Sequence, residues 1–265
     1  MRLSTDGIVL RSFRYEENRI LTILTRKQGI VTAFANHANR PRSPLAATTE
    51  LLCYSDFRLF KRKNEYVVDS ADSNIIFFGL RSHFENFSLA SYWAQLFAEL
   101  SPREEEASDY VNLLLGCLHY LEKETRPARL LKAIAELRLL TLSGYMPDLI
   151  ACSQCGVFEK TESYFFSLDG ELFCEKCKKK VSFPLEYHPN PERCPMLYRL
   201  TPGVVAAMRH ILYADARQIY AFSLSKDGEV LLSRAVEAYL LHQLGHTFPT
   251  LEFYRSLVTE PKNDS

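Results

Sequence analysis

Two short stretches, Cys152–Gly156 and Cys174–Cys177, read CSQCG and CEKC, so the chain holds two Cys-x-x-Cys pairs separated by 18 residues. Thiolate pairs in two short turns can close a tetrahedron around one soft divalent ion, and zinc is its usual occupant. An iron–sulfur cluster or free thiols are the alternatives. Four thiolates fill every coordination position of zinc, so the site is expected to be structural. We therefore expect a small zinc knuckle that is held by its metal, because so short a segment cannot bury a core of its own.

The composition is that of an ordinary globular protein, since 47% of the 265 residues are hydrophobic and 24% are charged. No apolar run approaches the roughly 18 residues that a membrane span needs. Residues 1–7 also lack the apolar segment of a signal peptide. We therefore expect a cytoplasmic protein without a membrane partner, whose cysteines are ligands or packed thiols instead of disulfides.

The charges are distributed unevenly, although the formal net charge is zero. Residues 1–80 carry 12 Lys and Arg against 8 Asp and Glu, and the remainder carries 20 against 24. A basic part joined to an acidic part suits a protein that places one surface on phosphate and another on a different partner.

Residues 1–80 contain short runs rich in β-branched residues, which is typical of strands. The sequence predicts strands at residues 8–10, 20–25, 30–34, 51–60 and 66–68. Five short strands within 80 residues suit a small closed barrel, and the OB-fold is the common five-stranded solution.

From about residue 84 the apolar period changes to that of helices. We expect a helix over 84–100 and a second that begins at Ser101–Glu104, which has the form of a capping box with proline at the first helical position. Further helices should end near Gly144, begin at Thr201–Pro202 and stop at Gly245. The cysteine segment lies between helical stretches and is therefore read as an insertion.

The expected fold is thus α+β and multidomain. An N-terminal five-stranded OB-fold β-barrel is followed by an α-helical domain with an inserted four-cysteine zinc knuckle. The predicted limits are 1–80 for the barrel, 81–150 with 182–265 for the helical domain, and 151–181 for the zinc-binding insertion.

The sequence contains no fingerprint of an enzyme. The phosphate-binding loop Gly-x-x-x-x-Gly-Lys-[Ser/Thr], the dinucleotide turn Gly-x-Gly-x-x-Gly and the nucleophile elbow Gly-x-Ser-x-Gly are all missing. The acidic run Glu104–Glu106 is expected in the first turn of a helix, where it favours the positive end of the helix dipole. We therefore expect no catalytic residues.

Basic residues recur through the predicted barrel, and aromatic residues such as Phe13, Phe34 and Phe60 lie among them. An OB-fold binds single strands by tracking phosphates with Lys and Arg while bases stack on exposed rings. The competing interpretation is that the rings fill the barrel and the charges keep its loops soluble. The predicted DNA-binding residues are Arg11, Arg14, Arg40, Arg42, Lys61, Arg62 and Lys63.

The order of these parts resembles the RecO family of bacterial recombination mediators over nearly the whole chain. The most specific part of the likeness is the junction of Leu137–Leu140 with Gly144–Pro147, which runs into the first cysteine pair. The segments Gly7–Arg11 and Tyr239–Gly245 also match.

The resemblance implies binding of single- and double-stranded DNA and annealing of complementary strands, without bond chemistry. It also implies work on the nucleoid with RecR, sometimes with RecF, and with the C-terminal tail of single-stranded DNA-binding protein, to load RecA at gaps. It implies one structural zinc ion, held by Cys152, Cys155, Cys174 and Cys177. Members of the family usually carry a glycine in the loop after the third strand, whereas this chain has Asn36–Arg42 there.

A different class of function also fits the cysteine pattern. A zinc-ribbon adaptor would bind protein or RNA and would not anneal DNA. An annealing assay with and without single-stranded DNA-binding protein separates the two hypotheses.

Overall fold

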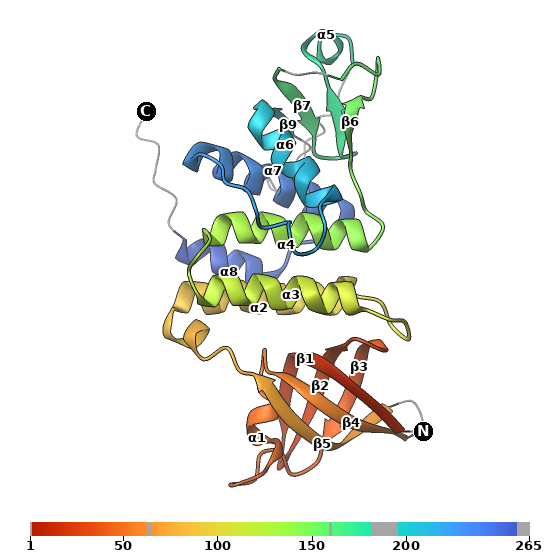
Figure 1. Ribbon diagram of the computed structural model, residues 1–265, viewed down its shortest axis with the longest axis vertical. Helices are drawn as coiled ribbons and strands as arrows, with labels where there is room; N and C mark the ends of the chain where they lie inside the picture. The colour runs from red at the N-terminus through yellow and green to blue at the C-terminus, as the bar shows by residue number, and fades with distance from the viewer. Residues whose placement is uncertain (1, 63–64, 159–160, 182–195, 259–265) are drawn as a thin grey trace. The chain divides into compact units, whose positions relative to one another are not determined.

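A computed structural model of the chain describes residues 2–62, 65–158, 161–181 and 196–258. Internal contacts divide the chain into two compact units (Figure 1). Unit 1 is discontinuous and comprises 1–125 and 248–265, and unit 2 comprises 126–247. These units are defined by contacts alone, and the domain limits expected from the sequence stay predictions.

Unit 1 begins with a closed five-stranded barrel, which confirms the predicted OB-type fold. Its strand order is β1-β2-β3-β5-β4, and only β3 and β5 pair in parallel, at Ala33–Tyr66 and Phe34–Val67. A short helix lies between β3 and β4. The elements are β1 (Arg2–Tyr15), β2 (Asn18–Thr25), β3 (Gly29–Ala35), α1 (Leu45–Thr48), β4 (Tyr54–Arg62) and β5 (Glu65–Ile75).

Alternation along the strands fills the barrel interior, because successive side chains of a strand point to opposite faces. Leu21 and Ile23 on β2 and Phe57 and Leu59 on β4 are almost completely buried in one apolar cluster inside the barrel. The residues between them on β4, such as Arg58, are exposed. A register error of one residue would turn this core outward, so the barrel core fixes which side chains can meet a ligand.

The remainder of unit 1 is helical. A 3₁₀ turn, η1 (Gly79–Ser82), leads to α2 (Phe84–Leu100) and α3 (Ser108–Glu122), and α8 (Pro249–Leu257) returns to this unit. Tyr92 and Trp93 of α2 are completely buried. Phe248, directly before α8, is also buried and meets the Tyr92 ring edge-on, with 5.7 Å between ring centroids. Residues from the two ends of the sequence therefore share one core.

The capping box expected at Ser101–Glu104 is wrong, because α3 begins only at Ser108. Residues 101–107 instead run along the β2–β3 turn, where the Ile30 amide donates to the Pro102 carbonyl (2.8 Å) and the Ala107 amide donates to the Arg26 carbonyl (2.7 Å). The Glu104 amide donates to Gln28 and completes the contact. The backbone groups that a helix would have paired are thus used to fasten the barrel to the helices.

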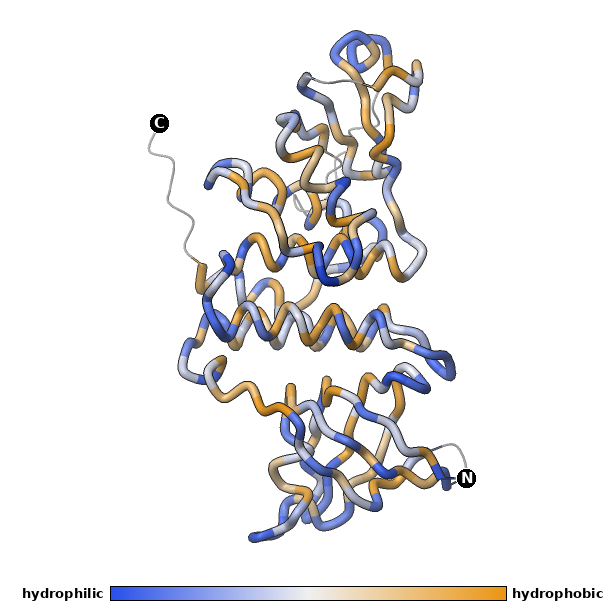
Figure 2. The backbone as a smooth tube through the Cα atoms, viewed as in Figure 1, coloured by the Kyte–Doolittle hydropathy of each residue, from blue (hydrophilic) through white to orange (hydrophobic). Residues whose placement is uncertain are grey.

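The described residues of unit 2 combine three long helices and the short helix α5 with a four-stranded sheet of order β6-β8-β7-β9. The predicted helix signals are confirmed here, since Thr201 caps α6 by accepting from the Val204 amide and Gly245 ends α7 with a left-handed φ of 71°. In Figure 2 hydrophobic and hydrophilic residues alternate along the helices, as one-sided burial requires. The elements are α4 (Ala128–Leu142), β6 (Asp148–Cys152), β7 (Ser163–Phe166), β8 (Glu171–Phe173), α5 (Glu175–Lys178), β9 (Leu197–Leu200), α6 (Pro202–Tyr213) and α7 (Lys226–Leu244).

Helices α4 and α7 share a buried ionic group. The Lys132 ammonium lies 2.7 Å from Glu136 on its own helix and also contacts Glu237 of α7. The two carboxylates raise the pKa of Lys132, although burial by itself would lower it. In the described part of the chain, none of the helices has both the length and the apolar character that crossing a bilayer requires.

Candidate functional site

The outer surface of the barrel carries two rows of apolar side chains that cross the strands. In the first row Ile8 lies opposite Leu24, and Leu24 lies opposite Ile30. All three side chains point away from the barrel interior yet are at most 4% exposed. Helices α2 and α3 contact β1 and β2, and the Ile30 amide donates to Pro102 in the segment that joins these two helices. The first row is therefore the surface on which the helices of unit 1 rest.

The second row is not covered in this way. The register pairs Phe13 with Ile20, Ile20 with Phe34, Phe34 with Val67, and Val67 with Phe60, so that one residue of each strand contributes. Phe13 is 65% exposed and Phe60 is 38% exposed, at the two ends of the row. Ile20 and Phe34 are half-buried, and Val67 is buried. We call these five residues the outer apolar row.

Arginine and threonine residues follow the outer apolar row along one side. On β1, β2 and β3 the residue two positions along the strand from the row also points outward. These residues are Arg11, Thr22 and Thr32, and they are paired in register with one another. Arg62 takes the corresponding place on β4, opposite Glu65. Neither arginine forms an ion pair with another residue in the described ranges. The structure thus brings two of the predicted DNA-binding residues, Arg11 and Arg62, beside the same row.

Lys61 and Arg14 occupy other places on the barrel. The Lys61 ammonium lies 5.8 Å from the centre of the Tyr66 ring, where it borders a cavity of about 300 Å³ that Gln28 and Arg103 also line. Arg14 is exposed near the tip of the β1–β2 hairpin, opposite Arg19. Lys63 lies outside the described residues.

The loop after β3 contains Arg40 and Arg42, the last two predicted DNA-binding residues, and their surroundings differ. Arg40 is bound by Glu17, with its Nε and Nη2 atoms 2.7 Å and 2.5 Å from the carboxylate. Hydrogen bonding from Arg40 is the main cause that lowers the pKa of Glu17. Arg42 is exposed with a φ of 65°, and His37 has a φ of 57°. Both conformations are ones that glycine adopts most easily, so the loop keeps a glycine-like backbone without a glycine.

A buried arginine fastens this loop to the hairpin. The side chain of Arg19 is 5% exposed and donates to Asn39 (2.8 Å), to Thr49 (3.0 Å) and to Glu50 (2.6 Å). Asn39 in turn donates to the carbonyl groups of Glu16 and Asn18. A buried charge persists only with such partners, so Arg19 is structural and is not available to a ligand.

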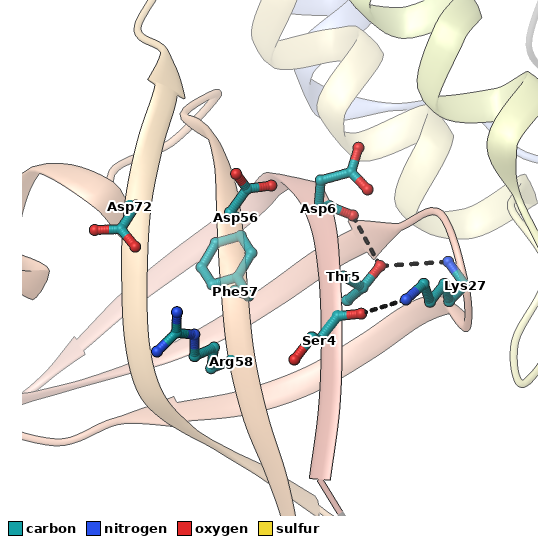
Figure 3. A pocket seen from close by; sticks show the side chains of 8 residues that line it. All are labelled: Ser4, Thr5, Asp6, Lys27, Asp56, Phe57, Arg58 and Asp72. Atoms are coloured by element: carbon teal, nitrogen blue, oxygen red, sulfur yellow. Dashed lines mark hydrogen bonds between the residues drawn. The ribbon is translucent and has the colours of Figure 1, made fainter.

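At the end of β4 remote from Arg62, three aspartates line one pocket together with Lys27 and Arg58 (Figure 3). Asp56 on β4 lies opposite Asp6 on β1 and opposite Asp72 on β5, and these three residues help to line a shallow pocket of about 350 Å³. Asp6 accepts from Arg26 (2.5 Å) and from the Tyr54 hydroxyl. Like charges opposite one another in a sheet are unfavourable, and Arg26 offsets the charge of Asp6. Lys27 and Arg58 line the same pocket, so this part of the barrel carries both signs of charge.

The four cysteines of unit 2 come together as their spacing predicts. Cys152 ends β6, Cys155 lies in the turn that follows, and Cys174 and Cys177 lie at the start and inside of α5. Their sulfur atoms all lie within 4.8 Å of one another, and Cys155 and Cys174 are 3.9 Å apart. Cys155 is exposed and the other three are buried. Zinc–sulfur bonds of about 2.3 Å place tetrahedral sulfur atoms about 3.8 Å apart, so this group can hold a metal ion.

Strand pairing and two backbone turns position the four cysteines. Pairing of β6 with β8 sets Cys152 opposite Leu172, two residues before Cys174. Gly156 has a φ of 70°, and its amide donates to the Cys152 carbonyl (2.8 Å), which closes the first turn. The Lys178 amide donates to the Cys174 carbonyl (3.0 Å) and closes the second.

Sequence reasoning missed several residues of the barrel surface. Arg2 lies opposite Phe60, and Arg58 lies two residues before it on β4, so both belong to the surroundings of the outer apolar row. Thr22 and Thr32 were also overlooked. Alternation within each strand could have shown that these side chains point outward. The register between strands, which places them beside one another, leaves no signal in a single sequence.

Comparisons with known proteins agree on one family. A model described as "Recombination protein O N terminal" matches residues 1–73, and one described as "Recombination protein O C terminal" matches residues 81–252. A protein of Acetivibrio thermocellus named "DNA repair protein RecO" is 29% identical over 256 residues, which cover 96% of this chain and 97% of that protein.

Two further relatives carry the same name. The protein of Symbiobacterium thermophilum is 30% identical over 260 residues, covering 96% of this chain and 97% of the relative. The protein of Heliobacterium modesticaldum is 33% identical over 226 residues, covering 83% of this chain and 77% of the relative.

Proposed function

Because the chain belongs to the RecO family of DNA repair proteins, we propose that it is a recombination mediator. It binds single- and double-stranded DNA, anneals complementary strands and helps to load RecA onto gaps coated with single-stranded DNA-binding protein. Its proposed partners are RecR, the C-terminal tail of single-stranded DNA-binding protein, and in the same pathway RecF and RecA. The proposed location is the cytoplasm, on the DNA of the nucleoid.

The observation that carries the proposal is the placement of Arg11 and Arg62 beside the outer apolar row, with Thr22, Thr32 and Glu65 on the three strands between them. Neither guanidinium forms a salt bridge with a described residue, although Glu65 lies opposite Arg62 in the register, and both arginines are exposed and can reach phosphate. Arginine neutralises phosphates and releases their counterions, which drives binding. Neutralised strands also repel one another less, so two of them can pair on the protein.

The cysteine cluster is proposed to hold one structural zinc ion. Four thiolates at tetrahedral distances suit zinc and leave it no open position for substrate or water. The ion would therefore supply folding energy to its segment and no bond chemistry. This agrees with a protein that works by binding and is not an enzyme.

A strand-annealing assay tests the proposed function. Two complementary oligonucleotides, one of them labelled, are mixed with the protein in the presence and absence of single-stranded DNA-binding protein. We expect faster annealing in both conditions, and we expect the variant Arg11→Ala/Arg62→Ala to be slower. Arg199→Ala is the matched control, because Arg199 lies in unit 2 and is bound to Glu162.

The result also decides between the proposed function and an adaptor function. A zinc-ribbon adaptor for protein or RNA would leave annealing at the uncatalysed rate in all conditions. Annealing that is equally fast in the wild type and in the double arginine variant would show that the barrel surface is not the DNA site.

A further inference from the structure

Exposure separates the four cysteines of unit 2. Cys152, Cys174 and Cys177 are at most 7% exposed, whereas Cys155 is exposed in the turn that follows β6. A cysteine is oxidised most readily when it is a thiolate that solvent can reach. Of the four, Cys155 is therefore the sulfur that a reagent in solution meets first.

The exposed sulfur has a second sulfur close by on the other turn. The Sγ atoms of Cys155 and Cys174 lie 3.9 Å apart. A disulfide bond is about 2.05 Å long, so the two atoms must approach each other by about 2 Å to form one. Gly156, the neighbour of Cys155, has nothing within 4 Å of its Cβ position. The first turn thus lies in open surroundings and has room for this movement.

The strands on which the two turns stand are held by helices of the same unit. Arg209 of α6 donates to the carbonyl groups of Leu149 (2.6 Å) and Ile150 (3.0 Å) in β6. Gly170, directly before β8, lies so close to α7 that a Cβ atom on it would be 2.5 Å from the Tyr239 ring. None of these contacts uses a cysteine. The turns can therefore rearrange while β6 and β8 stay attached to the helices.

Resting on the structural zinc ion proposed above, we propose that the cysteine cluster is also a site of reversible oxidation by peroxides. Cys155 is the residue that is oxidised, and Cys174 is the thiolate that completes a disulfide with it. Zinc suits this chemistry, because it has no redox change of its own and keeps the cysteines bound to it as thiolates. After oxidation two thiolates remain, which are too few to close a tetrahedron and retain the ion.

One molecule of hydrogen peroxide oxidises one pair of cysteines. The Cys155 thiolate attacks one peroxide oxygen, so that an S–O bond forms, the O–O bond breaks and hydroxide leaves. The Cys174 thiolate then attacks the Cys155 sulfur, forms the S–S bond and displaces the second hydroxide. Two protons from solvent convert the hydroxides to water. The two sulfur atoms have together lost two electrons, and the peroxide has gained them.

The disulfide would join the same two turns that the metal ion joins. A bridge between Cys155 and Cys174 connects the end of β6 with the end of β8, as the four thiolates around one ion do. The oxidised segment therefore keeps a covalent link in place of its metal. A thiol reductant reverses the bridge by thiol–disulfide exchange and makes all four ligands available again.

Zinc release from the full chain tests the proposal. The protein is loaded with zinc and treated with hydrogen peroxide in the presence of a chelator that changes colour when it binds the released ion. Histidine is also a zinc ligand, and one histidine with three cysteines still forms a closed site. Cys155→His removes the exposed sulfur. Cys152→His is the matched control, because it leaves Cys155 and Cys174 in place. Zinc content and melting temperature are measured for each protein before peroxide is added.

The wild type and Cys152→His should fall from about one zinc ion per chain to about zero, whereas Cys155→His should keep its ion. Peptide mapping follows each cysteine of the wild type separately and should find Cys155 bridged to Cys174. Cys53 and Cys117 are at most 1% exposed and should stay reduced. Treatment with a thiol reductant and zinc should restore the original zinc content.

Three results would overturn the proposal. The first is retention of zinc by the wild type at a peroxide concentration that oxidises glutathione. The second is release from Cys155→His as fast as from Cys152→His. The third is a bridge between Cys152 and Cys155, which would stay within one tryptic peptide because Lys160 is the next cleavage site after both. This map is made on the wild type, so it decides the matter even if a histidine variant fails to fold.

Failure of this proposal and failure of the zinc site itself give different results. A wild type that binds zinc and keeps it under peroxide leaves the structural zinc ion in place and removes only the oxidation. A wild type that takes up no zinc overturns both.

Discussion

Gly29 and Pro102 meet backbone to backbone. A Cβ atom on Gly29 would lie 2.0 Å from the Pro102 carbonyl oxygen, which accepts the hydrogen bond of Ile30 at 2.8 Å. The φ of Gly29 is 59°. The barrel can therefore fasten to the helices of its unit only because this turn carries no side chain.

Gly29→Ala should destabilise unit 1 strongly. The left-handed φ costs about 1 kcal/mol for alanine, and displacing the Pro102 carbonyl adds the loss of a buried hydrogen bond, about 1–3 kcal/mol. Gly245→Ala is the control, because its φ is 71° but nothing lies within 4 Å of its Cβ position. Thermal unfolding should show a clearly larger fall for Gly29→Ala than for Gly245→Ala. Equal falls would mean that the contact with Pro102 contributes nothing.

Removal of the two arginines beside the outer apolar row should flatten the salt dependence of binding. For single strands the log–log slope falls by about 0.7 for each phosphate contact removed. Arg11→Ala/Arg62→Ala should therefore lower it by about 1.4. Arg40→Ala should lower it less, since Arg40 is already bound to Glu17. Anisotropy titrations at several salt concentrations measure the slopes, and an unchanged slope in the double variant speaks against phosphate contact by these residues.

Loss of a cysteine ligand should affect unit 2 and spare DNA binding. Cys174→Ser should reduce the zinc content from about one ion per chain to well below one, because three thiolates no longer close the tetrahedron. Elemental analysis measures the zinc. Cys117→Ala, at a buried cysteine of α3, should keep it. Affinity for single strands should be unchanged, since the barrel belongs to unit 1, and a large loss of affinity would contradict this separation.

The buried ionic group of unit 2 should be costly to break. Lys132→Met leaves the carboxylates of Glu136 and Glu237 without their shared ammonium, and such a change costs about 3–5 kcal/mol. Adding Glu136→Leu should recover a large part of this loss, because the fully buried one of the two carboxylates is then also removed. Chemical denaturation of the single and double variants measures the difference. A double variant that is less stable than Lys132→Met would contradict the expected coupling.

Much of the fold is present in local sequence signals. Thr201–Pro202 and Gly245 predict the ends of α6 and α7 correctly because capping depends on neighbouring residues only. The two Cys-x-x-Cys pairs also predict correctly that the four cysteines come together, because the spacing of metal ligands within each pair is a local feature of the sequence. The five strands follow from their β-branched runs.

Other features depend on partners that are far away in sequence. Ser101–Glu104 has the local form of a helix start, but the β2–β3 turn takes its backbone groups instead. The candidate site likewise depends on residues that are far apart in the sequence. Phe13 and Phe60 are each visible in the sequence as aromatic residues among basic ones, yet only the pairing register through Ile20, Phe34 and Val67 connects them.

The division of unit 1 into two stretches of sequence has a consequence for biosynthesis. The barrel and α2 leave the ribosome first, but Phe248, which packs on Tyr92, follows only after all of 126–247 has been made. The helical layer of unit 1 thus cannot close until unit 2 has been synthesised in full. A nascent chain halted anywhere within unit 2 would carry a complete barrel above an open apolar surface, which is the kind of surface that chaperones bind.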